Sequence, residues 1–269
     1  MLSSAIIHLD PNFCLTHHEA AMNDLIQKAA QDLVSAKKAI ALTGAGISVE
    51  SGIPPFRGPG GLWEKIDPLE FAHIDAFMKD PAKVWNFFIK EMKEILDNAG
   101  PNNAHKSLAR LEELGIVTTI ITQNVDGLHQ TAGNTDVIEF HGNFAWQRCL
   151  NCDERFETIK LDISKIPPRC SCGGIYKPDC VFFGEIIPPH HLLRSEQVAS
   201  ACTIMLVIGT SAEIHPAALM PVIAKQAGAK VIEINLEKTS LTHKTSDYII
   251  MGKAGDIMKR LTSEVERLL

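Results

Sequence analysis

The sequence predicts an α/β fold in which a parallel sheet is covered by helices on both faces, together with a small second domain formed by two insertions. Short apolar runs rich in Ile, Val and Thr alternate with helical patterns, as expected of strands buried on both faces. A Pro- and Gly-rich stretch and a cysteine-rich stretch interrupt this alternation. The 269 residues are 45% hydrophobic and 22% charged, which excludes a disordered or fibrous chain.

The strands of the main sheet are expected at the continuous apolar runs. These runs lie at 39–46, 116–124, 137–140, 203–211 and 230–235. Helices are expected at 19–36 and 104–113, where apolar residues recur at helical spacing, and Gly115 provides a stop signal after the second. Residues 1–20 match no interpretable motif.

Two interruptions of this pattern define the second domain. The stretch at 51–61 contains too much Pro and Gly for a helix interior and is predicted to be a long loop that leads into helical segments up to about residue 97. The cysteine-rich stretch at 142–182 has little regular periodicity. We expect a large domain and a small domain with a cleft between them. The large domain is assigned to 1–53, 101–141 and 183–269, and the small domain to 54–100 and 142–182.

Charge and targeting signals restrict the partners. The net charge of −6 creates no global positive field, so direct nucleic-acid binding is not expected. No apolar run approaches the ~18 residues of a membrane span, and the N-terminus lacks the basic and long apolar regions of a secretion signal. Seven cysteines, four of them in one short stretch, suit metal binding in a reducing compartment better than disulfides. We therefore expect a cytoplasmic protein without a membrane segment.

Four cysteines have the spacing of a metal site. Cys149 and Cys152 form a C-x2-C pair, and Cys170 and Cys172 form a C-x-C pair after 17 intervening residues. Two short hairpins can present four thiolates to a tetrahedral zinc ion. Because four protein ligands leave no position for water or substrate, we expect one structural Zn²⁺ per chain. The alternative is a cluster of buried cysteines without metal.

A glycine-rich turn follows the first predicted strand. Gly44 and Gly46 stand where a doubly wound fold places backbone amides against a pyrophosphate. The third glycine of the dehydrogenase fingerprint is replaced by Val49, which disfavours a hydride-transferring enzyme. The loop that follows carries Phe56, whose ring can shield a reactive carbon from water, and Arg57, whose guanidinium can bind phosphate.

Polar residues also follow the next strands. Gln123, Asn124 and Asp126 follow the second strand, at the edge where parallel sheets bind ligands, although an ordinary helix cap would also use Asn or Asp there. His141 follows the strand at 137–140 and can act as a general base near neutral pH, whereas a structural histidine is the alternative. Asn235, after the last predicted strand, can bind a ribose hydroxyl.

Several motifs taken together resemble the sirtuins, the NAD-dependent protein-lysine deacylases. They are GAGISVESGIPPFRG, TQNVDGLH, EFHGN, the four-cysteine set, VFFGE, GTSAEIHPA and INLE, in family order from residue 39 to about 256. The resemblance implies a Rossmann-type large domain, a small zinc-and-helical domain, and a cleft where NAD meets an acyl-lysine peptide. Pro55 stands where many members have an acid, a feature shared with prokaryotic-type branches.

The resemblance also implies residue roles. His141 matches the family's general base toward the ribose hydroxyls, while Asn124 and Asp126 match the catalytic residues that hold nicotinamide and its ribose. The implied products are nicotinamide, acyl-ADP-ribose and free lysine. The positions matching NAD contacts are Gly44, Ala45, Gly46, Phe56, Arg57, Trp63, Gln123, Asn124, Val125, Asp126, Gly209, Thr210, Ser211, Asn235, Leu236, Glu237 and Ala254.

Substrate-binding positions are expected in the small domain and in the apolar stretch after it, which can pair with an extended peptide or be an ordinary core strand. They are Phe88, Val181, Phe182, Phe183, Gly184 and Glu185. Members that remove succinyl or malonyl groups carry a Tyr and an Arg three residues apart, and the matching positions here are Phe88 and Glu91. A carboxylate facing the acyl carboxylate is repulsive, so neutral acyl groups such as acetyl are expected.

Two further functions compete with deacylation. The same cleft can transfer ADP-ribose to a protein or hydrolyse NAD, and a non-catalytic module can sense NAD or bind a partner through its zinc ribbon. His141 favours deacylation, because that base serves a step after nicotinamide has left. The complete polar set at the strand ends disfavours a purely binding role.

Overall fold

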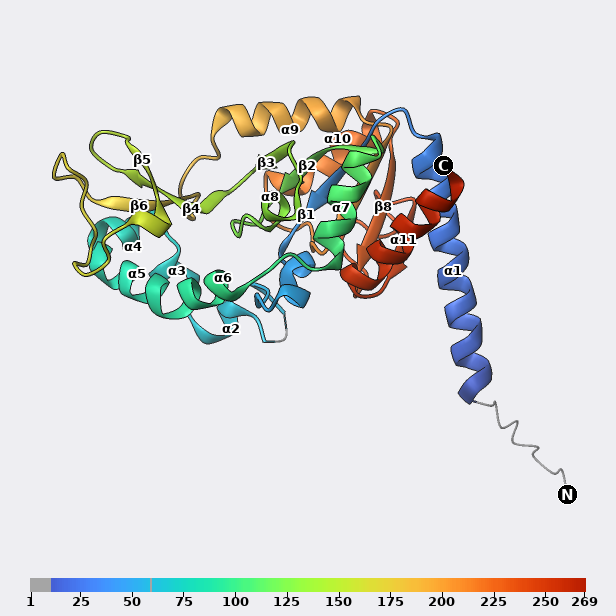
Figure 1. The fold of residues 1–269 in the computed structure, drawn as a ribbon, viewed down its shortest axis with the longest axis horizontal. Helices are drawn as coiled ribbons and strands as arrows, with labels where there is room; N and C mark the ends of the chain where they lie inside the picture. Colours follow the sequence, from blue (N-terminus) through green and yellow to red (C-terminus); the bar gives the residue numbers. More distant parts are fainter. Residues whose placement is uncertain (1–10, 59) are drawn as a thin grey trace, which may run out of the picture.

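The computed structural model describes residues 11–58 and 60–269, so the first ten residues of the expected large domain lie outside it. A six-stranded parallel sheet has the order β3-β2-β1-β7-β8-β9 (Figure 1). Its strands are β1 (Ala39–Thr43), β2 (Val117–Thr122), β3 (Val137–Glu139), β7 (Ile204–Ile208), β8 (Lys230–Asn235) and β9 (Tyr248–Met251). The order reverses between the neighbours β1 and β7, and open sheets of this kind bind ligands beyond the strand ends at such a point.

Helices cover both faces of this sheet. One face packs against α1 (Pro11–Ser35), α7 (Asn103–Glu113) and α11 (Ala254–Leu268), and the other against α9 (Pro189–Ala201) and α10 (Met220–Gln226). Within β1, Ala39 and Ala41 face the first group, and Ile40 and Leu42 face the second. All four side chains are buried, which explains why the run is continuously apolar. The predicted α/β fold class is confirmed.

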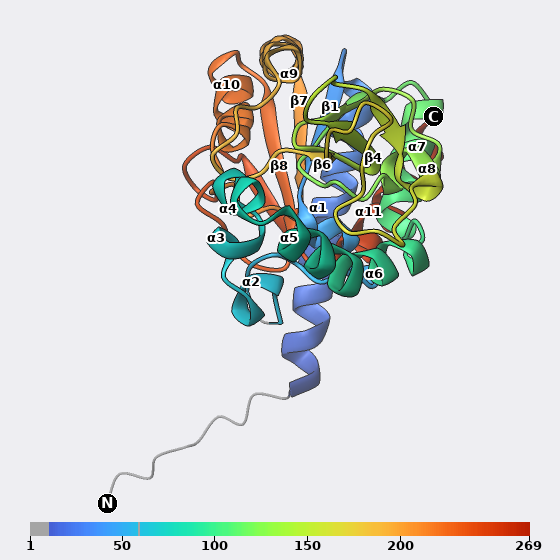
Figure 2. The same cartoon turned by 90° about the vertical axis from the view of Figure 1, so that its left-hand side faces the viewer.

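A smaller unit is built from two stretches of chain on one side of the sheet (Figures 1 and 2). Its antiparallel sheet consists of β4 (Gly142–Cys149), β5 (Arg155–Glu157) and β6 (Tyr176–Cys180), in the order β5-β4-β6. Its helical part consists of α2 (Leu62–Lys65), α3 (Pro68–Phe71), α4 (Ile74–Lys79), α5 (Pro81–Phe87), the π-helix η2 (Phe88–Lys93) and α6 (Glu94–Asn98). Phe77, Trp85 and Tyr176 contribute to a separate apolar core.

The structure differs from the predicted elements in several places. The strands β1, β2 and β7 end before the predicted residues, at Thr43, Thr122 and Ile208, and turns follow. The helix predicted to begin at residue 19 begins at Pro11, and β9 was not predicted. The cysteine-rich stretch, which has little periodicity, contains three short strands. The remaining elements are short: α8 (Leu128–Ala132) and the 3₁₀ turns η1 (Ala45–Ser51), η3 (Thr158–Lys160) and η4 (Ala217–Leu219).

Over residues 11–58 and 60–269, no helix combines the length and apolar character needed to cross a membrane.

Candidate active site at the carboxyl edge of the sheet

A cavity of about 1190 Å³ lies at the carboxyl ends of the parallel strands, between the main sheet and the smaller unit. Most of the residues selected from the sequence line it. They are Gly44, Ala45, Gly46, Phe56, Arg57, Trp63, Phe88, Gln123, Asn124, Val125, His141, Val181, Phe182, Phe183, Gly184, Glu185, Gly209, Thr210, Ser211, Asn235, Leu236 and Glu237.

Two predicted NAD contacts, Asp126 and Ala254, do not line this cavity although both are described. The Asp126 carboxylate accepts hydrogen bonds from the Ser48 hydroxyl at 2.7 Å and from the backbone N–H of Leu128 at 3.0 Å. Ala254 is buried at the start of α11, where the next backbone N–H, of Gly255, donates to Glu50. Asp126 is half-buried, and the Ser48 hydroxyl joins its carboxylate to the Asn124 amide.

The turns after β1 and β7 are packed so closely that only glycine fits. A Cβ on Gly44 would lie 2.6 Å from Thr210 Cβ, and one on Gly46 would lie 2.7 Å from Gly209 Cα. Gly209 has a φ of +60°, and a Cβ there would lie 2.3 Å from the backbone nitrogen of Ile47. The two strand ends therefore meet as bare backbone at the point where the strand order reverses. A dinucleotide pyrophosphate can approach such a surface closely.

Asn124 is held at the cavity wall by three hydrogen bonds and is only 6% exposed. Its Nδ2 donates to the Gly44 carbonyl and to the Ser48 hydroxyl, both at 3.1 Å, and its backbone N–H donates to Thr122 Oγ1 at 3.1 Å. Sequence reasoning missed Ser48, which joins Asn124 to Asp126. The available signal was its place in the glycine-rich motif, one turn of η1 beyond Gly44.

His141 lies at the cavity with one ring nitrogen already engaged. Its Nδ1 is 3.0 Å from the Gln123 carbonyl oxygen. Because a carbonyl can only accept, Nδ1 carries the hydrogen and Nε2 of the neutral ring keeps its lone pair. Burial lowers the pKa of His141 below its usual 6.5, and the bond to Gln123 opposes this shift. The ring is therefore suited to accept a proton at Nε2 near neutral pH.

Amide side chains from two strands meet at Thr210. Gln123 Nε2 donates to Thr210 Oγ1, and Asn235 Nδ2 donates to the Thr210 carbonyl, each at 3.0 Å. The ends of β2, β7 and β8 are thereby linked into one polar wall. Across the cavity, Phe56 stacks on Trp63 with ring centroids 5.3 Å apart, and Arg57 is exposed beside them.

The stretch predicted to bind peptide is fixed at both ends. Val181 N–H donates to the His141 carbonyl at 2.8 Å, and Phe183 forms a backbone bridge to His73. This apolar stretch is not a strand beyond Cys180, where β6 ends, and Glu185 turns back to accept a hydrogen bond from Phe182 N–H at 2.7 Å. The Glu185 carboxylate also accepts from Lys177 Nζ at 3.0 Å.

The cavity wall at Phe88 corrects one sequence expectation. Phe88 is 6% exposed and lines the cavity, but Glu91 is exposed and does not. The helix is π-type from Phe88 to Lys93, and its turn is wider than that of an α-helix. Met92, and not Glu91, therefore lines the cavity beside Phe88. Phe144 completes this wall, with its ring 4.7 Å from that of Phe88. The expected repulsion by Glu91 is therefore wrong, and the pocket wall is apolar.

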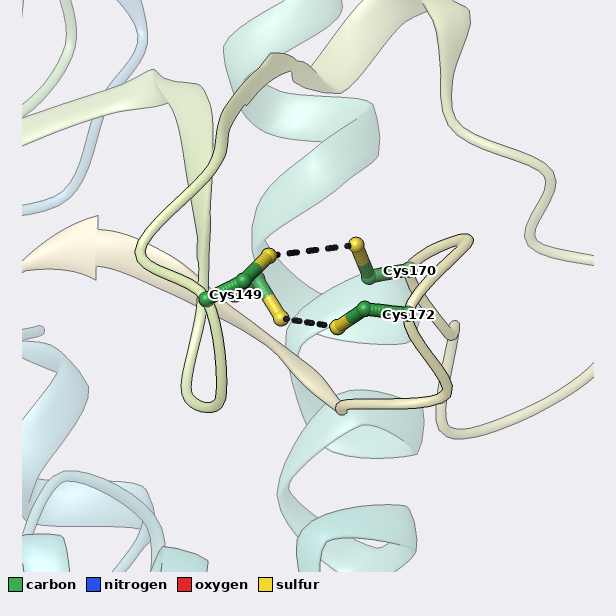
Figure 3. A group of neighbouring side chains, drawn as sticks. Cys149, Cys170 and Cys172 are labelled. Carbon is green, nitrogen blue, oxygen red and sulfur yellow. Dashed lines mark hydrogen bonds between the residues drawn. The ribbon is translucent and has the colours of Figure 1, made fainter.

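The four predicted metal ligands come together at one end of the smaller sheet. The Sγ atoms of Cys149, Cys152, Cys170 and Cys172 lie within 4.8 Å of one another. Figure 3 shows Cys170 and Cys172 opposite Cys149. The Sγ atoms are 3.5 Å apart for Cys149 and Cys172 and 3.6 Å apart for Cys152 and Cys170. Zn–S bonds of about 2.3 Å in a tetrahedron place sulfurs about 3.8 Å apart, so this donor set fits a closed, structural zinc site.

The cavity has further lining residues that the sequence reasoning did not assign. One group of them consists of Ile186, Ile187, Glu213, Ile214, His215, Pro216, Lys238, Thr239 and Ser240. This group lies within eight residues after the end of β6, β7 or β8, so proximity to a strand end was the available signal for it.

Comparisons with known proteins agree with this geometry. Residues 44–216 match the Sir2 family. NAD-dependent protein deacylase 2 of Pyrobaculum aerophilum is 46% identical over 238 residues, which cover 88% of this chain and 94% of that protein. NAD-dependent protein deacetylase of Caldivirga maquilingensis is 42% identical over 248 residues, with 90% and 95% covered.

Solved structures are similar over the same length. A Sir2 homologue in complex with NAD superposes with a TM-score of 0.82 at 44% identity, covering 90% of this chain and 94% of that one. A complex of Sir2 with p53 peptide and NAD+ gives a TM-score of 0.79 at 33% identity, covering 88% and 97%.

Proposed function

This chain belongs to the Sir2 family, and we propose that it is an NAD-dependent protein-lysine deacylase that releases nicotinamide, acyl-ADP-ribose and free lysine. The observation that carries the proposal is the placement of His141 and Asn124 at one cavity, next to a strand end of bare glycine backbone. A base, a buried amide and a pyrophosphate surface are the three elements that this chemistry requires. Acyl-lysine peptides are the proposed substrates, held by Val181–Glu185.

NAD, when bound, supplies an electrophilic ribose carbon with nicotinamide as its leaving group. Gly44, Gly46 and Gly209 would hold the pyrophosphate, because all three line the cavity in turns too tightly packed for any side chain. Gln123 and Asn235 would contact the two riboses, and Asn124 would orient the nicotinamide. His141 would take a proton from a ribose hydroxyl at Nε2. Asp126 would support Asn124 through Ser48.

Location and domain division also belong to this proposal. Thiolate ligands must remain reduced to hold zinc, which favours a cytoplasmic location. The division into a large domain and a small domain of two insertions is supported by the separate apolar core of the smaller unit.

Incubating the purified protein with NAD and an acetyl-lysine peptide tests the proposal. We expect deacetylated peptide, nicotinamide and acetyl-ADP-ribose in equal amounts, measured by mass spectrometry. Nicotinamide release without deacetylation would contradict it and favour ADP-ribosyl transfer or NAD hydrolysis.

The apolar wall predicts a preference for neutral acyl groups. A succinyl carboxylate bound there would lie against the side chains of Phe88, Met92 and Phe144. Burying an unpaired charge costs more than the ~1–3 kcal/mol that burying an unpaired neutral polar group costs. We expect kcat/KM for succinyl-lysine to be at least about tenfold below that for butyryl-lysine, which has the same chain length without the charge. A parallel assay of acetyl-, butyryl- and succinyl-lysine peptides measures this. Succinyl turnover equal to or above butyryl turnover would show that a cation reaches the pocket.

A further inference from the structure

A chain of buried polar groups lies directly behind Asn124. Thr43 ends β1, Thr122 ends β2, and His129 belongs to α8, and all three are at most 3% exposed. The Thr43 hydroxyl donates to Thr122 Oγ1 at 2.9 Å, and His129 Nε2 lies 2.9 Å from the same Thr43 oxygen. Thr122 Oγ1 then accepts the backbone N–H of Asn124 at 3.1 Å. The four groups form one continuous chain from α8 to the cavity wall.

The direction of this chain follows from its hydrogens. Because Thr43 has a single hydroxyl proton and donates it to Thr122, His129 must supply the proton of the remaining bond. His129 is therefore the neutral tautomer with its hydrogen on Nε2. Burial, with a smaller contribution from the neighbouring ring of His105, lowers the pKa of His129 to about 3. A neutral donor is thus maintained at any pH at which the protein works.

His105 fixes the orientation of the His129 ring. The two rings meet edge to face with centroids 4.9 Å apart, and His105 is fully buried. Neither ring nitrogen of His105 has a hydrogen-bond partner among the described residues. Burial lowers its pKa to about 4, and the charge of Asp126 opposes that shift. A neutral, unpaired ring in this place packs against His129 without competing for its Nε2 hydrogen.

We propose that His129 is a positioning residue for Asn124: through the hydroxyls of Thr43 and Thr122 it fixes the backbone of the turn that carries the Asn124 amide into the cavity. The same turn is tied to β1 by a hydrogen bond from Gln123 N–H to the Thr43 carbonyl at 3.0 Å, and it holds His141 through the Gln123 carbonyl. Small displacements of this turn would therefore move both groups. The inference rests on the proposed function, since the effect is read out through Asn124.

Hydroxyl-to-methyl variants test the chain with little change in shape. Thr43→Val removes the link, whereas Thr43→Ser retains it. The matched control is Thr119→Val, because Thr119 is also buried in β2 but donates its hydroxyl to Asp136 at 2.8 Å, away from the chain. His129→Leu removes the N–H group that bonds Thr43, and His129→Gln keeps an N–H group at a similar distance from the backbone.

We expect Thr43→Val and His129→Leu to lower kcat for deacetylation by about tenfold, with KM for the peptide unchanged, because misplacement of a catalytic group costs rate rather than peptide binding. Thr43→Ser and His129→Gln should stay within about threefold of the parent, the loss expected for less than one hydrogen bond. A purely structural role would lower the thermal midpoint of Thr43→Val and Thr119→Val alike and leave kcat of both unchanged, which would overturn the proposal.

Hydrogen exchange keeps the inference testable without enzyme activity. The amide of Asn124 should exchange faster in Thr43→Val than in the parent or in Thr119→Val, in a measurement that needs neither NAD nor peptide. Equal exchange in the three proteins would also overturn the proposal. An inactive parent protein would instead contradict the proposed function, while the exchange comparison would still decide the role of the chain.

Discussion

Replacing His141 with alanine is expected to lower the rate of deacetylation by about 10²- to 10⁴-fold, the range for loss of a general base. The Nδ1 bond to the Gln123 carbonyl leaves Nε2 of His141 as the proton acceptor. A second histidine, His215, also lines the cavity, but among the described residues it has no such bond to orient its ring. Because the base serves a step after nicotinamide leaves, nicotinamide release should fall less than deacetylation. Mass spectrometry of both products in one assay measures the difference.

The pH dependence follows from the same residue. In the proposed reaction the neutral form of His141 is the active base. Burial lowers the pKa of His141 below 6.5, so activity should persist to lower pH than for an exposed histidine. The acid limb of kcat/KM should lie below pH 6.5. His190→Ala is the control, since His190 is exposed on α9 outside the cavity lining. Equal loss of activity in both variants, or none in His141→Ala, would refute the assigned role.

Removing the zinc is expected to unfold the smaller sheet and abolish deacetylation. Zinc contributes about 10–16 kcal/mol in small zinc modules, which is as large as the whole stability of a typical domain. Cys152→Ser should lower the metal content from one zinc per chain, measured by elemental analysis, and lower the thermal midpoint. Cys202→Ala is the control, because Cys202 is a cysteine outside the cluster, with its Sγ donating to the Ala199 carbonyl.

A chelated protein or Cys152→Ser variant that retained full activity without zinc would contradict the structural role. The larger sheet should keep its far-ultraviolet signal after zinc loss, because its two apolar clusters contain none of the four ligands. This comparison separates local from global unfolding.

The sequence predicted those features for which a residue type is required by a local steric or ligand rule. The bare turn at Gly44 and Gly46 and the four thiolates follow from steric and ligand rules that act over a few residues. The continuous apolar runs likewise located five of the six strands of the main sheet. The ends of β1 and β7 were placed too late, because apolar pattern alone does not mark where a strand gives way to a turn.

Other features depend on contacts that are distant in sequence. The position of Glu91 depends on a π-helix, and no short pattern distinguishes that helix from an α-helix. Ser48 and His129 acquire their roles only when β1, β2 and α8 pack together. The inward turn of Glu185 depends on an ion pair with Lys177, which lies eight residues earlier in the chain.

The strand β4 limits how this region can vary in length. It begins directly after His141 and ends at the first zinc ligand, Cys149. From Trp146 to Cys149 the strand is paired without interruption, so adding or deleting one residue there would turn every following side chain to the opposite side of the sheet. Its start is also fixed, since Gly142 has a φ of +81° and a Cβ there would lie 2.2 Å from the Asp179 carbonyl. The length of this paired segment, which leads into the metal ligand Cys149, must therefore stay constant.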